Sequence, residues 1–479
     1  MNAPIIWIII PGLVAIVLFI LQDRVKFVIS VGILLALLLG LFAIVLPIGQ
    51  TINLGMLSFE ISDTLVVLGR RFVISQGDTA LIALMYFGAA FWFGGVIFAK
   101  TTRSFIPLAL GISATLIAAF SVVPFLYGPL LFELAVLVSI PLLALPGMGV
   151  SKGMLRYLTY QTLGFPFLLF SGWLLAGIEV SPGNSVQILQ ASVLLALGFA
   201  FLLGVFPFHT WIPMLGESAH PYNIAFVYYQ LPIAITIYAL NLFDQYVWLR
   251  SSVTTHSILI IVGITMIFVG GTITAFQRHL GRMMGYALIV DIGFSLIAIS
   301  SGLVNNESLG LFFGMLLPRG LALGVWSLAL VVISSKVVGG NGIPTIVPSS
   351  LSFRSIQGIA HRLPVASFCL LIAYFSIAGL PLMAGFSVRH AILDAFQGSN
   401  ILSQTLIFLG MIGVLIGGMR TIAEMISGTV DSGWQKNETA WEVVFLSLGS
   451  VSLLILGLFP KWFIPVMFYV TESFDHIGP

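Results

Sequence analysis

The sequence has little charge and almost no cysteine. Only 8% of its 479 residues are Lys, Arg, Asp or Glu, against roughly a quarter in soluble proteins, whereas 59% are apolar and the mean hydropathy is +1.12. A chain of this composition is predicted to lie in lipid, which excludes a cytosolic enzyme and a nucleic-acid-binding protein. With Cys369 as the single cysteine, a disulfide framework, a cysteine metal site and an iron–sulfur cluster bound by this chain are also excluded.

Sequence motifs of catalytic chemistry are absent as well. The chain contains no HExxH, no Gly-rich phosphate loop, no GxSxG elbow and no paired His/carboxylate spacing for a metal. We therefore expect no redox or hydrolytic site, no metal and no cofactor in this chain.

Apolar stretches long enough to cross a bilayer recur along the whole sequence. A spanning helix needs about 20 apolar residues, and fourteen stretches qualify, near residues 3–21, 27–46, 79–99, 104–124, 127–147, 157–178, 187–206, 222–243, 257–277, 283–303, 308–335, 366–396, 401–427 and 443–460. The first lacks a basic leader, so we interpret it as a retained span and not as a cleaved signal peptide. Residues 51–61 alternate apolar with polar residues over a stretch too short to span, which predicts a surface strand or hairpin.

Lys and Arg are distributed unequally over the two sides of this layout. With the N-terminus on side one, four lie on side one: Arg70, Arg71, Arg250 and Lys461. Thirteen lie on side two: Arg24, Lys26, Lys100, Arg103, Lys152, Arg156, Arg278, Arg282, Lys336, Arg354, Arg362, Arg420 and Lys436. Because positive residues concentrate in cytoplasmic loops, side two is predicted to be cytoplasmic and both termini to be non-cytoplasmic.

Helix-breaking residues interrupt the seventh and the twelfth predicted span. Proline removes a backbone donor, and in lipid the freed carbonyls must be satisfied by protein or water. Breaks five spans apart indicate two inverted five-helix repeats, spans 4–8 and 9–13, around a water-lined interior; the alternative is that proline is simply commoner in membrane helices. The predicted break and hinge residues are Gly204, Pro207 and His209 in the seventh span and Gly379, Pro381 and Gly385 in the twelfth.

Few ionisable residues fall inside the predicted spans. Each needs a partner, water or a function, because a charge at mid-bilayer costs at least about 2.5–3.5 kcal/mol. Glu133 and Asp291 are the groups that could exchange protons, whereas arginine keeps its proton and only sets the electric field. The candidates for a buried proton or ion pathway are Glu133, Asp291, Arg319, Arg389, His390 and Asp394.

A purely structural role is the alternative for each candidate. Glu133 and Asp291 would then pair with arginines only to hold the helices together. His209 and His390, which follow helix breaks, would only bond a freed backbone carbonyl.

These patterns predict an all-α polytopic membrane protein with a single membrane domain over 1–479. We divide it into spans 1–3 with a surface hairpin (1–103), a first inverted repeat (104–243), a second inverted repeat (257–427), and a last span with a tail (443–479).

Four runs carry a resemblance to a known family: LLGVFPFHTWIP (Leu202–Pro213), GRMMGYALIVDIGFSLIAISSG (Gly281–Gly302), GLPLMAGFSVRH (Gly379–His390) and FEL around Glu133. The chain resembles the antiporter-like subunits of respiratory complex I, a superfamily that includes subunits of Mrp antiporters and membrane-bound hydrogenases. Its length is most similar to the N-type (subunit 2) and M-type members. The resemblance implies proton movement by Glu/Lys pairs along a hydrated central axis.

The sequence departs from this family at its lysines. Glu133 occupies the glutamate position of the fifth helix, but the lysine position of the seventh helix falls on Leu202, and that of the eighth helix falls near 232–234. Four positions of the second half also differ: Asp291 stands where the tenth helix often has histidine, Arg319 and Leu323 stand near a histidine and a lysine of the eleventh, and Arg389 stands at the lysine or glutamate of the twelfth.

The resemblance and its departures leave three functions open. The first is proton or cation translocation by an altered, lysine-poor relay in a complex I-like, Mrp-like or hydrogenase-like assembly. The second is a degenerate, non-pumping scaffold or coupling subunit of such an assembly, and the third is an autonomous secondary transporter. The expected partners are other membrane subunits, lipids, and protons or cations, with no nucleic acid, in an energy-transducing membrane.

Overall fold

The computed structural model describes residues 2–54, 57–145, 147, 149–180, 185–304, 309–337, 348–396, 400–427 and 436–478. The tip of the predicted hairpin, Gly55 and Met56, and the first residue of the predicted span 308–335, Ser308, lie outside the described residues.

Helices make up most of the described structure, and each predicted span overlaps at least one of them. A short π-helical turn, Ile5–Ile9, leads into the first. The helices are α1 (Ile10–Ile20), α2 (Val25–Val45), α3 (Thr79–Ala99), α4 (Phe105–Ser121), α5 (Gly128–Leu143), α6 (Lys152–Val180), α7 (Ser185–Leu202), α8 (Trp211–Ser218), α9 (Pro221–Gln245), α10 (Val247–Arg250), α11 (Val253–Phe276), α12 (Leu280–Val304), α13 (Leu309–Val337), α14 (Pro364–Ala378), α15 (Phe386–Ala395), α16 (Ile401–Ile426), α17 (Ala440–Leu458) and α18 (Ile464–Tyr469).

Within the described residues, nine helices are long and apolar enough to cross a membrane, and four further apolar helices are shorter. The prediction of a helical membrane protein is therefore confirmed. The number of fourteen crossings stays a prediction, because several of the helices are shorter than a bilayer is thick.

Two small antiparallel sheets lie near the N-terminus. Strand β1 (Thr51–Leu54) pairs with β2 (Leu57–Glu60) where the alternating pattern predicts a hairpin. The sequence analysis misses a second hairpin, in which β3 (Thr64–Val67) pairs with β4 (Arg70–Val73), and β4 also pairs with the two-residue strand β5 (Val122–Val123). The chain is thus not purely helical.

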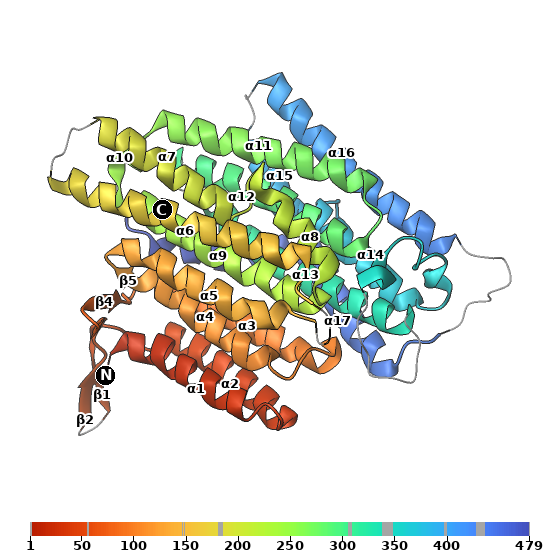
Figure 1. Cartoon of the computed structure of the whole chain (residues 1–479), viewed down its shortest axis with the longest axis horizontal. Coiled ribbons are helices and arrows are strands. Elements are labelled where there is room, and N and C mark those ends of the chain that lie inside the picture. The colour runs from red at the N-terminus through yellow and green to blue at the C-terminus, as the bar shows by residue number, and fades with distance from the viewer. Residues whose placement is uncertain are drawn as a thin grey trace.

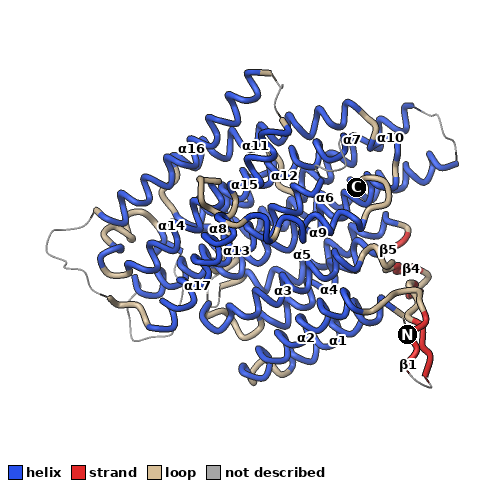
Figure 2. Tube along the Cα trace, turned by 180° about the vertical axis from the view of Figure 1, so that it is seen from behind, coloured by secondary structure: helices blue, strands red, loops and turns tan. Residues whose placement is uncertain are grey.

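The helices run roughly side by side, with α1 and α2 along one edge of the bundle and α16 along the opposite edge (Figure 1). Both chain termini lie toward the end of the bundle that carries the hairpins, and the view from behind agrees (Figure 2). The centre is formed by α9, α12 and α13, which are buried along most of their length. In α9 every residue from Pro221 to Tyr238 is buried.

Glycines allow α11 and α16 to approach each other at backbone distance. A Cβ atom at Gly271 would collide with the backbone carbonyl of Gly410, and one at Gly413 would collide with the carbonyl of Gly271. Small residues take this role in membrane helix packing.

The two predicted helix breaks are present, and both use the same device. At the end of α7, Gly204 has a φ of +63°, and the N–H of the next residue, Val205, donates to the carbonyl of Ala200. At the end of α14, Gly379 has a φ of +75°, and the N–H of Leu380 donates to Phe375 in the same way. A left-handed glycine followed by this bond is a Schellman motif, which stops each helix and satisfies freed carbonyls inside the membrane domain.

Histidine caps the start of α9. The Nδ1 atom of His220, in the short connection between α8 and α9, accepts the backbone N–H of Tyr222 at 3.2 Å. Burial lowers the pKa of His220 to about 4. In the unfolded chain the pKa of the same ring is near 6.5. At a pH between about 4 and about 6.5, the unfolded chain therefore binds a proton at this histidine that the folded chain does not.

We predict that this proton makes the fold acid-sensitive. Stability should fall as the pH drops from about 6.5 to about 4, and His220→Asn should reduce that fall, because asparagine keeps a cap acceptor but does not titrate. The measurement is the thermal unfolding midpoint at several pH values for both chains. His476→Asn at an exposed histidine is the control, and equal acid sensitivity in wild type and His220→Asn would contradict the prediction.

Candidate functional site

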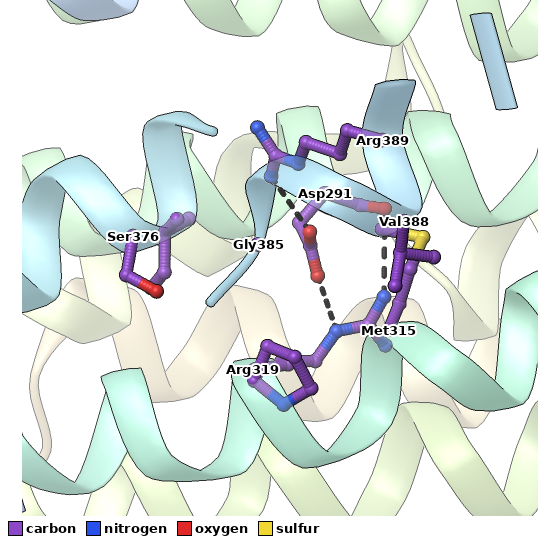
Figure 3. Close-up of a pocket in the computed structure, with 9 residues that line it drawn as sticks. Asp291, Met315, Arg319, Ser376, Gly385, Val388 and Arg389 are labelled. Atoms are coloured by element: carbon purple, nitrogen blue, oxygen red, sulfur yellow. Dashed lines mark hydrogen bonds and ion pairs between the residues drawn. The ribbon is translucent and has the colours of Figure 1, made fainter. Parts of the chain in front are cut away.

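Three charged side chains from three helices meet in the interior of the second half of the chain. Asp291 lies on α12, Arg319 on α13 and Arg389 on α15, and Figure 3 shows the three converging. All three are buried, with side-chain exposures of 7%, 3% and 3%. We call this set the Asp291 triad.

Asp291 uses both carboxylate oxygens. Its Oδ2 accepts from Nε of Arg319, and its Oδ1 accepts from a terminal nitrogen of Arg389 at 2.7 Å. Within the part of the chain that the structure describes, Asp291 is the carboxylate that pairs with either guanidinium. The triad therefore ties α12, α13 and α15 together through one acidic group.

Neighbouring groups fix the two arginines. Ser295, one helical turn after Asp291, accepts from Arg319 and donates to the carbonyl of Asp291 at 3.0 Å. The guanidinium of Arg389 lies 4.7 Å from the centre of the Phe294 ring, a cation–π distance.

The break between α14 and α15 brings Arg389 into the triad. A Cβ atom at Gly379 would lie 2.8 Å from Cδ of Arg389, and one at Gly385 would collide with the carbonyl of Ser376. Glycine at both positions thus leaves the room in which α15 turns back toward α12.

A small cavity adjoins the triad. It has a volume of about 10 Å³ and is lined by all three charged residues together with Ser376, Gly385 and apolar side chains. This is roughly the space of a single water molecule, so the site can hold one small species and no organic substrate.

Glu133 lies apart from the triad. On α5, its Oε1 accepts from the hydroxyl of Thr162 on α6 at 2.7 Å, while its Oε2 is buried and has no hydrogen-bond partner among the described residues. The central helix α9 packs against both α5 and α13. Glu133 on α5 and Asp291 on α12 therefore belong to separate sites, and α9 contacts α5 and the Arg319 helix α13.

The remaining candidate pathway residues are also outside the triad. His390 and Asp394 face outward from α15, are about half exposed, and pair with each other at 3.4 Å. His209 is buried after the first break, and its ring stacks on Phe206 with 5.5 Å between ring centres. Its Nδ1 has no partner in the described structure.

The family lysine position of the first half remains apolar in the fold. Leu202 is the last residue of α7 and is buried, and its carbonyl accepts from Nε2 of Gln161 at 3.0 Å. Pro232 lies in the middle of buried α9. No described lysine replaces either position, because each lysine in the described residues lies at a helix end or in a connection.

Sequence analysis missed Ser295, Phe294 and Ser376 as members of the site. Ser295 could have been predicted from the sequence, since a residue four positions after Asp291 lies on the same helix face. Phe294 and Ser376 carry no sequence signal, because their role depends on how α12, α14 and α15 pack.

The described residues contain no group of three or more His, Cys, Asp or Glu side chains placed to hold a metal ion.

Comparison with known proteins points to one family. A sequence model of the family described as "NADH:quinone oxidoreductase/Mrp antiporter, TM" matches residues 129–417, more than half of the chain and including Glu133 and the Asp291 triad. The chain is 25% identical over 323 residues to NADH-quinone oxidoreductase subunit N of Coxiella burnetii. That alignment covers 66% of this chain and 63% of the relative, so the chain spans somewhat less than two thirds of that protein's length.

Solved structures share the fold over nearly the whole chain. A chain of respiratory complex I from Thermus thermophilus superposes with a TM-score of 0.69 at 19% identity, covering 95% of this chain and 99% of that one. A chain of a membrane-bound sulfane sulfur reductase, an archaeal respiratory membrane complex, gives a TM-score of 0.75 at 16% identity, covering 99% and 97%.

We predict that the triad is a structural unit whose charges must be removed together. Asp291→Ala leaves two buried guanidiniums without their carboxylate, and breaking a buried ion pair costs about 3–5 kcal/mol. The triple variant Asp291→Leu, Arg319→Met and Arg389→Met removes all three charges and should unfold close to the wild-type temperature.

Thermal unfolding in detergent tests this prediction. The control is Asp394→Ala, whose exposed carboxylate should contribute at most about 1 kcal/mol. If Asp291→Ala unfolds at the same temperature as Asp394→Ala, the triad does not hold the helices together.

Proposed function

The chain belongs to the NADH:quinone oxidoreductase/Mrp antiporter transmembrane family, and from this premise we propose that it is a membrane subunit of a complex I-like assembly that takes part in proton or cation translocation. It is a multi-pass membrane protein, and its place is an energy-transducing membrane such as the bacterial cell membrane. Subunit N relatives and structural neighbours from respiratory membrane complexes support the proposed partners, which are other membrane subunits.

The observation that carries this proposal is Asp291 held between arginines of two helices, one of them the short half-helix α15 that follows a break. Arginine does not release its proton, so within the triad only Asp291 changes charge. A shift of α15 that withdraws Arg389 leaves Asp291 with one counter-charge and changes its affinity for a proton. Movement of a half-helix is thereby coupled to proton uptake or release.

The topology is part of the proposal. Fourteen crossings, two inverted repeats (α4–α9 and α11–α16) and non-cytoplasmic termini in a single membrane domain agree with the charge distribution of the loops. The shared Schellman ending of α7 and α14 supports the repeat, because corresponding half-helices then break in the same way. The termini, which lie toward one end of the bundle, support their common side.

A scaffold role is the second candidate, and Leu202 favours it. With no lysine at that position, Glu133 in the first half lacks the charge partner through which the family resemblance implies coupling. In that case the second half would keep the Asp291 triad only to join its helices. The cavity beside the triad has room for about one water molecule, so the triad itself is not a binding site for an organic solute.

Proton uptake by proteoliposomes decides between translocation and scaffold. The intact purified assembly is driven by its own reaction, and we expect Asp291→Asn to lower the protons moved per turnover at least several-fold, with Glu133→Gln tested in parallel. Asp23→Asn, at a carboxylate that is 84% exposed, is the matched control and should pump as the wild type does. If Asp291→Asn and Glu133→Gln both pump normally in an intact assembly, the relay is wrong and the scaffold role stands.

A further inference from the structure

The charges of the Asp291 triad do not balance. Two guanidiniums, always protonated, face one carboxylate, so the buried set carries one net positive charge when Asp291 is ionised. A net charge in a low-dielectric interior is strongly unfavourable unless a counter-ion or hydrogen-bonding group compensates it.

The cavity beside the triad has the donors that an anion needs. It is lined by Arg319, Arg389 and Ser376 as well as by the carboxylate of Asp291, which both arginines already bind, while Met315 and Val388 close it with apolar surface. Guanidinium and hydroxyl groups donate hydrogen bonds, so the excess charge and the excess donors lie at the same place.

Ser376 provides the second, independent sign of a ligand. It is 1% exposed, and its hydroxyl has no hydrogen-bond partner in the described structure. Serine and threonine inside helices usually donate to a carbonyl three or four residues earlier, as Ser295 does to Asp291 and Thr274 does to Gly270. Ser376 makes no such bond among the described residues, and it is one of the residues that line the cavity beside the triad.

From these observations we infer that the cavity binds one small monovalent anion, such as chloride. A cation is excluded by the net positive charge. A water molecule accepts hydrogen bonds but leaves the charge uncompensated, whereas a carboxylate or phosphate is too large for a cavity of about 10 Å³. A monatomic anion satisfies the charge and the donors, and among the anions compared it comes nearest to the size of one water molecule.

Anion binding and protonation of Asp291 are then linked. When Asp291 takes up a proton the net charge of the triad rises by one, which strengthens anion binding, and by reciprocity a bound anion favours the proton. The inference rests on the proposed function in that it uses the same triad. It is tested at equilibrium without turnover, so that failure to bind an anion and failure to pump are separate results.

The test uses the full chain purified in detergent with its native partners. Thermal unfolding is measured as sodium gluconate is replaced by sodium chloride at constant ionic strength, and crystals or films in bromide locate the anion by its X-ray absorption edge. We expect a saturable, chloride-specific rise of the unfolding temperature in the wild type. Asp291→Asn should bind chloride at least tenfold more tightly, and Arg389→Gln should lose the response.

Serine variants keep the test decisive if the charge variants fold poorly. Ser376→Ala removes an unpartnered hydroxyl and should fold normally but bind chloride several-fold more weakly. Ser367→Ala is the matched control, since Ser367 is a buried serine of α14 whose hydroxyl also lacks a partner but which does not line the cavity. Equal unfolding temperatures of the wild type in chloride and gluconate, or identical chloride responses of the two serine variants, would overturn the inference.

Discussion

One buried carboxylate shared by two guanidiniums organises the second half of this membrane protein. Charges are expensive in lipid unless they are paired and hydrogen-bonded, so Asp291, Arg319 and Arg389 specify one another and thereby the relative positions of α12, α13 and α15. Ser295 and Phe294 then restrict the two guanidiniums further. An apolar contact of the same area is non-directional and would constrain the helices less.

The triad exists only because α14 stops short. An uninterrupted helix would carry Arg389 past α12, whereas the Schellman ending at Gly379 and the room at Gly385 let the chain restart as α15 in a new direction. The same ending at Gly204 leaves Leu202 and a buried, apolar helix end in the first half. The same Schellman ending therefore lies beside a charged cluster in the second half of the chain and beside apolar residues in the first half.

Much of the fold is readable from the sequence because lipid imposes simple rules. Apolar length predicts the helices, glycine and proline predict both breaks, and the scarcity of charge identifies Asp291, Arg319 and Arg389 as a small set that must find partners. The pairing of Asp291 with Arg319 and Arg389 cannot be predicted from the sequence, since the depth of a residue along a helix does not determine which way its side chain points. Glu133, His390 and Asp394 are also ionisable residues within apolar stretches of the sequence, yet the packing of the helices places them outside the triad. The second hairpin was missed because Thr64–Val73 is too short and irregular to show a clear alternation.

The composition of α9 has a consequence for how the halves communicate. From Pro221 to Phe243 this central helix carries no charged side chain, and it contacts α5, which carries Glu133, and α13, which carries Arg319. No charged side chain in this part of α9 therefore lies between the two sites to relay a change of charge. A change at one site can reach the other as a displacement of the side chains packed against α9, which is buried on every face through its first eighteen residues.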